Sequence, residues 1–128
     1  MSEPDFLLEE PQKIYNIKHR AFQFSKDIIL FVSETKFEKV FHSICDQLVR
    51  SATSIGANLV EAKAGASRKD FLKFYIISLK SVNETKYWLC LIRDSIQSDK
   101  NKISSLLQEA DELSKIIASI IISIKEGQ

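Results

Sequence analysis

The stretch RKDFLKFYIISLKSVNETKYWLCLIRDSIQ, residues 68–97, decides the fold class. Its apolar and small residues recur at alternating spacings of three and four, which places them on one face of an α-helix. Ser67 and Asp70 form a capping box, which predicts that the helix begins here. Because the stretch contains no Gly or Pro, it predicts one helix roughly 45 Å long. The residues of this face are Phe71, Tyr75, Ser78, Val82, Thr85, Leu89, Ile92 and Ile96.

Three more segments carry the same helical period, and they run over about residues 16–33, 36–64 and 102–125. Thr35 and Glu38 predict a second capping box, at the start of 36–64. Both prolines precede residue 12, so neither interrupts a predicted helix. Because the short connections force neighbouring helices to run antiparallel, the sequence predicts an all-α, up-down-up-down four-helix bundle. A left-handed C-terminal cap is predicted at Gly65.

The charge distribution divides the chain into a tail and a domain. Four acids and no base lie in the first ten residues, so we expect a flexible acidic tail over 1–12 and the bundle domain over 13–128. The N-terminus lacks the basic-then-apolar pattern of a signal peptide. Residues 116–124 form the most apolar run, which is too short to span a bilayer. These features favour a cytoplasmic protein with no membrane partner.

The sequence contains no recognisable catalytic constellation. His19 and His42 are the only histidines, and they lack the spacing of paired metal ligands. Cys45 and Cys90 do not form a CxxC pair, which argues against a zinc site. No Gly-rich phosphate loop is present. We therefore expect no enzymatic activity, no metal and no cofactor.

Polar residues run beside the apolar faces of the second and third predicted helices. If these helices are antiparallel about a turn near Ala66, Ser54 faces Ser78. Arg50 then lies within a turn of Glu84, the carboxylate that a buried arginine requires. We interpret the stripe as a polar layer that fixes helix register, and the alternative is a contact line for a ligand or nucleic acid. The layer comprises Arg50, Ser54, Asn58, Ser78, Ser81 and Glu84.

The third predicted helix is apolar on a second face. A four-helix bundle needs one apolar stripe per helix, and a helix that is apolar on two faces usually buries both. We therefore expect a homo-oligomer whose interface lies on this helix, joined by the first predicted helix. The alternative is a thicker core within one chain. The interface candidates are Leu72, Ile76, Leu79, Tyr87, Trp88 and Leu91.

Residues 47–62, QLVRSATSIGANLVEA, resemble the hallmark of the bacterial four-helix-bundle proteins encoded in 23S ribosomal RNA intervening sequences, the S23 family. Residues 67–71 resemble that family's third-helix start, and 81–89 its S-x-x-E-x-x-x-x-L segment. The resemblance implies an up-and-down bundle assembled as a ring-like homopentamer. A related branch, the accessory variability proteins of diversity-generating retroelements, works with a reverse transcriptase and its RNA. This chain differs from that strongly basic branch in its net charge of +1.

Basic residues cluster at the start of the first predicted helix and at the second turn. In an up-down bundle these two places lie at the same end, so the residues would form one patch that a ring multiplies. Phosphate binding mainly needs such positive charge, and we predict RNA or DNA binding. The alternatives are ordinary solvated cations, or an oligomeric scaffold that binds a protein, such as a reverse transcriptase, without nucleic-acid contact. The candidates are Lys63, Arg68, Lys69, Lys73, Lys18 and Arg20.

Overall fold

The computed structural model describes residues 12–63 and 66–127, and it is all-α over this part of the chain. A single 3-10 turn, η2, precedes α2, and no strand occurs in the described residues. The predicted all-α four-helix bundle is therefore confirmed. The elements are α1 (Gln12–Thr35), η2 (Lys39–Phe41), α2 (His42–Glu61), α3 (Arg68–Ser95) and α4 (Lys100–Glu126).

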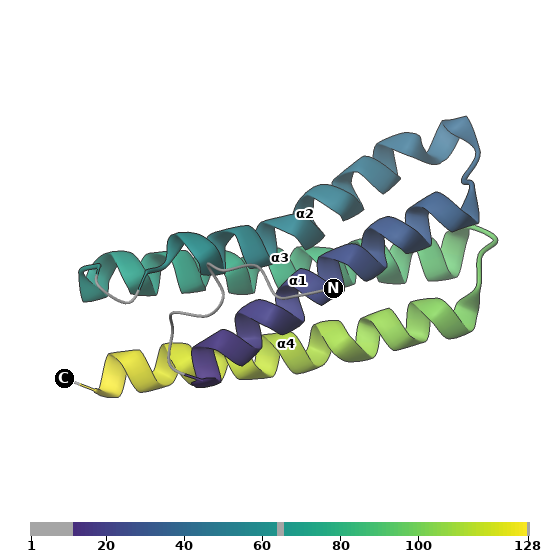
Figure 1. The fold of residues 1–128 in the computed structure, drawn as a ribbon. Coiled ribbons are helices and arrows are strands. Elements are labelled where there is room, and N and C mark those ends of the chain that lie inside the picture. The colour runs from purple at the N-terminus through teal and green to yellow at the C-terminus, as the bar shows by residue number, and fades with distance from the viewer. Residues whose placement is uncertain (1–11, 64–65, 128) are drawn as a thin grey trace.

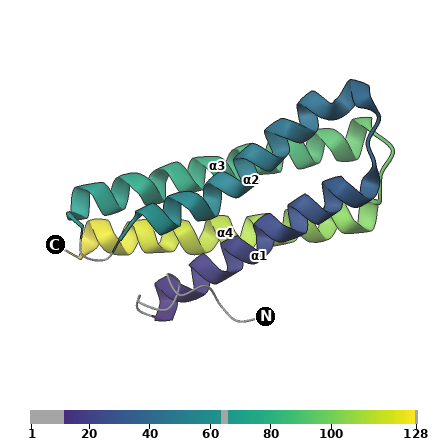
Figure 2. The same cartoon turned by 45° about the horizontal axis from the view of Figure 1, so that its top comes forward.

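Consecutive helices run antiparallel, as predicted (Figure 1). α2 lies along α3, α3 lies along α4, and α1 contacts both α2 and α4. Figures 1 and 2 show that α1 crosses its neighbours obliquely. Its first turn therefore begins short of the end of the bundle where the α2–α3 turn and the last turn of α4 lie. The four helices keep their up-down order, but the start of α1 does not reach that end.

The apolar faces that the sequence predicts form one continuous core. Every residue predicted for the inner face of α3 is buried, from Phe71 to Ile96. At the start of α2, Cys45 is buried, whereas Ile44 and the preceding Phe41 of η2 are half-buried beside the core. The buried apolar residues described in α1 are Ile17, Ala21, Phe24, Ile28 and Phe31, whose spacings of four and three place them on one face of the helix.

The connection between α1 and α2 differs from the prediction. Thr35 ends α1, and its hydroxyl donates to the Phe31 carbonyl at 2.6 Å instead of capping a following helix. Lys36 comes next with a φ of 54°, in the left-handed region that interrupts a right-handed helix. Glu38 precedes η2 and makes no side-chain cap hydrogen bond. The predicted capping box is therefore wrong, and α2 begins only at His42.

The starts of α3 and α4 are capped by side-chain oxygens. Ser67 Oγ accepts a hydrogen bond from the Asp70 N–H at 3.1 Å, which confirms the predicted start of α3. The carboxylate of Asp99, which the sequence pattern did not predict as a cap, accepts from two N–H groups in the first turn of α4. The predicted cap at Gly65 lies outside the described residues.

Gly56 offers a test of the α1–α2 contact. A Cβ at this position would lie 3.5 Å from the Cβ of Ala21, which is ordinary van der Waals contact. We expect Gly56→Ala to raise the free energy of unfolding by about 0.5–1 kcal/mol, because alanine is the better helix former. Gly56→Leu should lower it by about 1–3 kcal/mol through overpacking. Urea unfolding measures the free energy of unfolding of both variants. An alanine variant less stable than the wild type would contradict the described spacing between α1 and α2.

Candidate nucleic-acid interface

A layer of small polar side chains fills the contact between α2 and α3. Ser81 Oγ donates to Ser54 Oγ at 2.9 Å, and the side-chain amide of Asn58 donates to the same oxygen at 2.9 Å. Ser78 Oγ donates to the Ile55 carbonyl at 2.9 Å. Such partners stabilise buried hydroxyls, and the small side chains let the two helices approach closely. These residues therefore serve helix packing.

The register of this contact differs from the predicted one by up to about one helical turn, although Ser78 still bonds to Ile55, the neighbour of its predicted partner. Ser54 meets Ser81, not the predicted Ser78. Further from the α2–α3 turn, Thr85 Oγ1 donates to Ser51 Oγ at 2.9 Å. The sequence thus predicts the kind of contact but not its level along the helices.

The predicted ion pair between Arg50 and Glu84 is not formed. Arg50 is exposed because Ser51 occupies the contact, and neighbouring residues of a helix point about 100° apart. Glu84 instead accepts a hydrogen bond from Trp88 Nε1 at 3.2 Å. Arg50 and Glu84 therefore lie on the outside of the bundle and not in the polar layer.

Four cations gather where α2 ends and α3 begins. They are Lys63, Arg68, Lys69 and Lys73, which we name the turn cluster. All four are exposed, and none takes part in an ion pair within the described part of the chain. The end of the bundle at the α2–α3 turn therefore presents unpaired positive charge.

The surroundings of the turn cluster keep it positive. Glu61 and Asp70 are the two acids between residues 61 and 73, against the four cations of the cluster. Arg68 and Lys69 of the cluster lie, together with Asp70, in the first turn of α3, where the positive end of the helix dipole lies. Cationic side chains and a helix N-terminus together favour the binding of an anion.

The cations predicted at the start of α1 do not extend this surface. Arg20 makes a two-point ion pair with Glu109 of α4, with N···O distances of 2.7 and 3.1 Å. The hydrogen bond that Arg20 donates to Glu109 raises the pKa of Arg20. Lys18 is only 3% exposed and lines a groove between α1 and α2. The predicted merger of the two clusters is therefore not observed, since these two side chains are turned to the chain itself.

Other cations along the bundle are also paired with carboxylates. Asp111 binds Lys86 at 3.2 Å and Lys115 at 3.1 Å, and Lys102 binds Glu34 at 3.1 Å. These pairs were not predicted from the sequence. Only Asp111 and Lys115, four residues apart on one helix, carry a local signal, because the other pairs join different helices.

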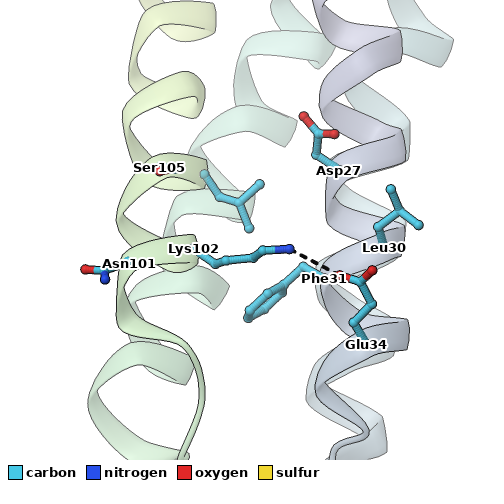
Figure 3. Close-up of a pocket in the computed structure, with 8 residues that line it drawn as sticks. Asp27, Leu30, Phe31, Glu34, Asn101, Lys102 and Ser105 are labelled. Atoms are coloured by element: carbon cyan, nitrogen blue, oxygen red, sulfur yellow. Dashed lines mark hydrogen bonds and ion pairs between the residues drawn. The ribbon is translucent and has the colours of Figure 1, made fainter.

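A groove of about 430 Å³ lies between α1 and α4. Figure 3 shows the ion pair between Lys102 and Glu34 reaching across it. Leu30 lines the groove and is 50% exposed, whereas Phe31 and Leu106 are buried. Its lysine is already bound to a carboxylate, so we do not assign phosphate contact to this groove.

The interface candidates on α3 are less exposed than their sequence pattern suggests. Only Tyr87 is strongly exposed, at 61%. The half-buried candidates are Leu72, Ile76, Leu79, Trp88 and Leu91. On α1, by contrast, Phe22, Ile29 and Leu30 are all exposed. The larger exposed apolar surface thus belongs to the first helix.

The described residues hold no group of three or more His, Cys, Asp or Glu side chains arranged to bind a metal. Cys45 and Cys90 are free thiols, and burial raises the pKa of Cys45. Among the described helices, none is both long enough and apolar enough to cross a membrane.

Comparison with known proteins gives the chain its family. The model of the 23S rRNA-intervening sequence protein family matches residues 13–119. The chain belongs to this family. It is similar to a crystal structure of a protein of unknown function from the S23 ribosomal protein family of Bacteroides thetaiotaomicron, with 34% identity and a TM-score of 0.74. The similarity covers 85% of this chain and 97% of that one, and no curated protein matches the chain.

Part of the motif that carries the family resemblance lies in the packed interior of the chain. Residues 47–62 span most of α2 and supply Ser54 and Asn58 to the polar layer. The turn cluster begins only after the motif, at Lys63. Ser54 and Asn58 of the motif therefore describe how the helices pack, whereas its Gln47, Arg50 and Glu61 are exposed.

The shared carboxylate of Asp111 gives a pH-dependent test of the paired cations. Hydrogen bonds from Lys115 and Lys86 hold its pKa below the ordinary value of 3.8. Such a carboxylate stabilises the fold above its ordinary pKa, and the contribution is lost as the pH falls through the lowered value. We expect Asp111→Asn to unfold at a lower temperature than the wild type at pH 7, with the difference shrinking below pH 3.8.

Asp46→Asn is the matched control for this test, because Asp46 is exposed and makes no ion pair in the described chain. Thermal unfolding over a pH series compares the two variants. A destabilisation of Asp111→Asn that persists unchanged at the lowest pH would show that packing, and not charge, is lost.

Proposed function

We propose that this chain is a non-catalytic cytoplasmic protein that binds RNA through the turn cluster, as a homo-oligomer. The observation that carries the proposal is a contrast among its cations. Arg20, Lys86 and Lys102 are bound to carboxylates, whereas the turn cluster has no such partner in the described chain. Exposed cations without a carboxylate partner can exchange their counterions for phosphates, which is the main source of nucleic-acid affinity.

RNA is favoured as the ligand on two grounds. The family name refers to 23S rRNA, which makes ribosomal RNA the first candidate. The first turn of α3 places the positive end of a helix dipole among the cluster cations, an arrangement that suits phosphate groups. Contacts to phosphates position a protein without reading sequence, so we expect affinity that depends strongly on salt and weakly on sequence.

Self-association would set several turn clusters side by side. The outer side of α1 exposes Phe22 and Ile29, and we assign the contact between subunits to this surface. A ring-like homopentamer, the assembly implied by the family resemblance, would carry one turn cluster per subunit. Several weak phosphate contacts on one particle combine into a much higher overall affinity.

A protein-binding scaffold is the second candidate function. Val40 in η2 is 74% exposed, and Leu30 lies exposed near the same end of the bundle, opposite the turn cluster. Exposed apolar side chains of this kind mark contacts with other proteins. A partner such as a reverse transcriptase could dock there without any nucleic acid.

Charge reversal in the turn cluster tests the first candidate. We expect the double variant Lys69→Glu and Lys73→Glu to weaken RNA binding by about tenfold or more and to flatten its salt dependence, because two phosphate contacts are lost. The matched control is Lys36→Glu with Lys39→Glu, which changes two exposed lysines at the opposite end. Fluorescence anisotropy with a 23S rRNA fragment over a salt series measures both.

Equal weakening by the two double variants would show that binding follows overall charge, which contradicts a role for the turn cluster. Absence of binding by the wild type even at low salt would remove RNA as the direct ligand. The protein-binding scaffold would then be favoured over RNA binding.

The subunit contact has its own test. We expect Ile29→Glu to dissociate the oligomer, because a carboxylate placed in an apolar contact is left without a partner. Ile122→Glu on α4 is the control, since Ile122 is exposed to a similar degree, 55% against 47% for Ile29. Light scattering gives the mass of each variant. If only the Ile122→Glu variant dissociates, the contact between subunits lies on α4 and not on α1.

A further inference from the structure

A line of exposed residues extends from the turn cluster along the outer face of α3. Lys69, Lys73, Lys80 and Tyr87 follow one another at spacings of four, seven and seven residues, which keeps them on one side of the helix. All four are exposed. At a rise of about 1.5 Å per residue the line is roughly 27 Å long. We name it the outer stripe.

The aromatic end of the outer stripe rests on a fixed base. The Tyr87 ring packs edge-to-face on Trp88, with centroids 5.0 Å apart and planes at 78°. Trp88 is itself half-buried against the core, and its Nε1 donates to Glu84 at 3.2 Å. The phenol ring is therefore held in place while 61% of the residue faces solvent. A large ring in this position has apolar surface to offer a ligand.

The charges around Tyr87 suit an anionic ligand. Arg50 is exposed, and it adjoins Ser51, which accepts the hydrogen bond from Thr85 two residues before Tyr87. Arg50 is thus placed on α2 at the level of the ring. Glu84, three residues before Tyr87, accepts the indole N–H and keeps its negative charge, so the positive charge for a ligand comes from Arg50 and from the lysines of the stripe.

We infer that the outer stripe binds single-stranded RNA, with Lys69, Lys73 and Lys80 on the phosphates and Tyr87 as the platform on which a base stacks. The inference rests on the proposed function and adds to it the class of RNA. Lysines alone would not distinguish single-stranded from duplex RNA, because both carry phosphates. An exposed ring does distinguish them. The bases of a duplex are already stacked on one another, whereas a single strand has free base faces that can stack on the ring.

The charge pattern of the outer stripe also separates it from the proposed subunit contact. The interiors of subunit interfaces are depleted of charged residues, lysine among them. The stripe places Lys73 and Lys80 between the turn and Tyr87, whereas the α1 surface has Ile29 and Phe22. Burial of the stripe between copies would bring these lysines into an apolar contact, so the aromatic end is better matched to a polyanion.

Trp88 supplies the measurement, because it is the only tryptophan and it touches Tyr87. The full-length protein is titrated with a single-stranded RNA of about ten nucleotides and with a duplex of the same length, at several salt concentrations. Binding is followed by anisotropy of the labelled RNA and by Trp88 fluorescence. We expect tighter binding of the single strand and a change in Trp88 fluorescence with the single strand only.

Two variants measure the contribution of the Tyr87 ring to RNA binding. Tyr87→Ala should weaken single-strand binding by about tenfold and leave duplex binding unchanged, because one stacked base is lost. Tyr87→Phe keeps the ring face and should bind as the wild type does. Light scattering of both variants in the same buffer shows whether the oligomer persists.

The outcomes separate this inference from the proposed function. If the Lys69→Glu and Lys73→Glu variant loses RNA while Tyr87→Ala does not, and single strand and duplex bind alike, the stacking platform is overturned and the proposed function stands. If the wild type binds neither RNA, both fail. If Tyr87→Ala dissociates the oligomer, the ring belongs to a contact between copies and the inference is again overturned.

Discussion

The contact between α2 and α3 depends on hydroxyl groups that are small enough to let the helices close and polar enough to need partners. A buried hydroxyl left without a partner costs about 1–3 kcal/mol. Ser81 with Ser54, and Thr85 with Ser51, therefore favour a register in which each oxygen is satisfied. A purely apolar contact would tolerate sliding by one turn far more readily. The register in turn sets which residues of α2 and α3 lie side by side along the bundle.

Helical periodicity predicted what depends on one segment at a time. The buried face of α3 from Phe71 to Ile96 follows from spacing alone, because an apolar stripe on a soluble helix has to be covered. Thr35 could not be assigned in this way, since a threonine between two helices can cap the second or end the first, and the left-handed backbone at Lys36 decides between them. The ion pair of Arg20 with Glu109 joins residues 89 apart, and no local pattern contains the register of α1 against α4.

The candidate site was predicted only in part, for the same reason. The turn cluster lies beside a turn, where exposure follows from the connection itself, and the structure places all four cations in solvent. Lys18 sits inside a helix, where exposure depends on how a neighbouring helix crosses, and here it is covered. The second apolar face of α3 shows the same limit. Leu72 and Tyr87 look alike as apolar positions in the sequence, and only the packed chain shows that the first is half-buried and the second open.

The proposed subunit contact on α1 and the proposed RNA-binding surface on α3 differ in composition. α1 crosses α4 obliquely (Figure 2), and Phe22 and Ile29, each next to a buried residue of its inner face, stay in contact with water. Burying such side chains between subunits would gain roughly 25 cal/mol per Å² of apolar area. The outer face of α3 gains less from the same burial, because lysines interrupt it and desolvating them is costly. Self-association through α1 and anion binding along α3 can therefore coexist on one chain, since each surface is poorly suited to the other's role.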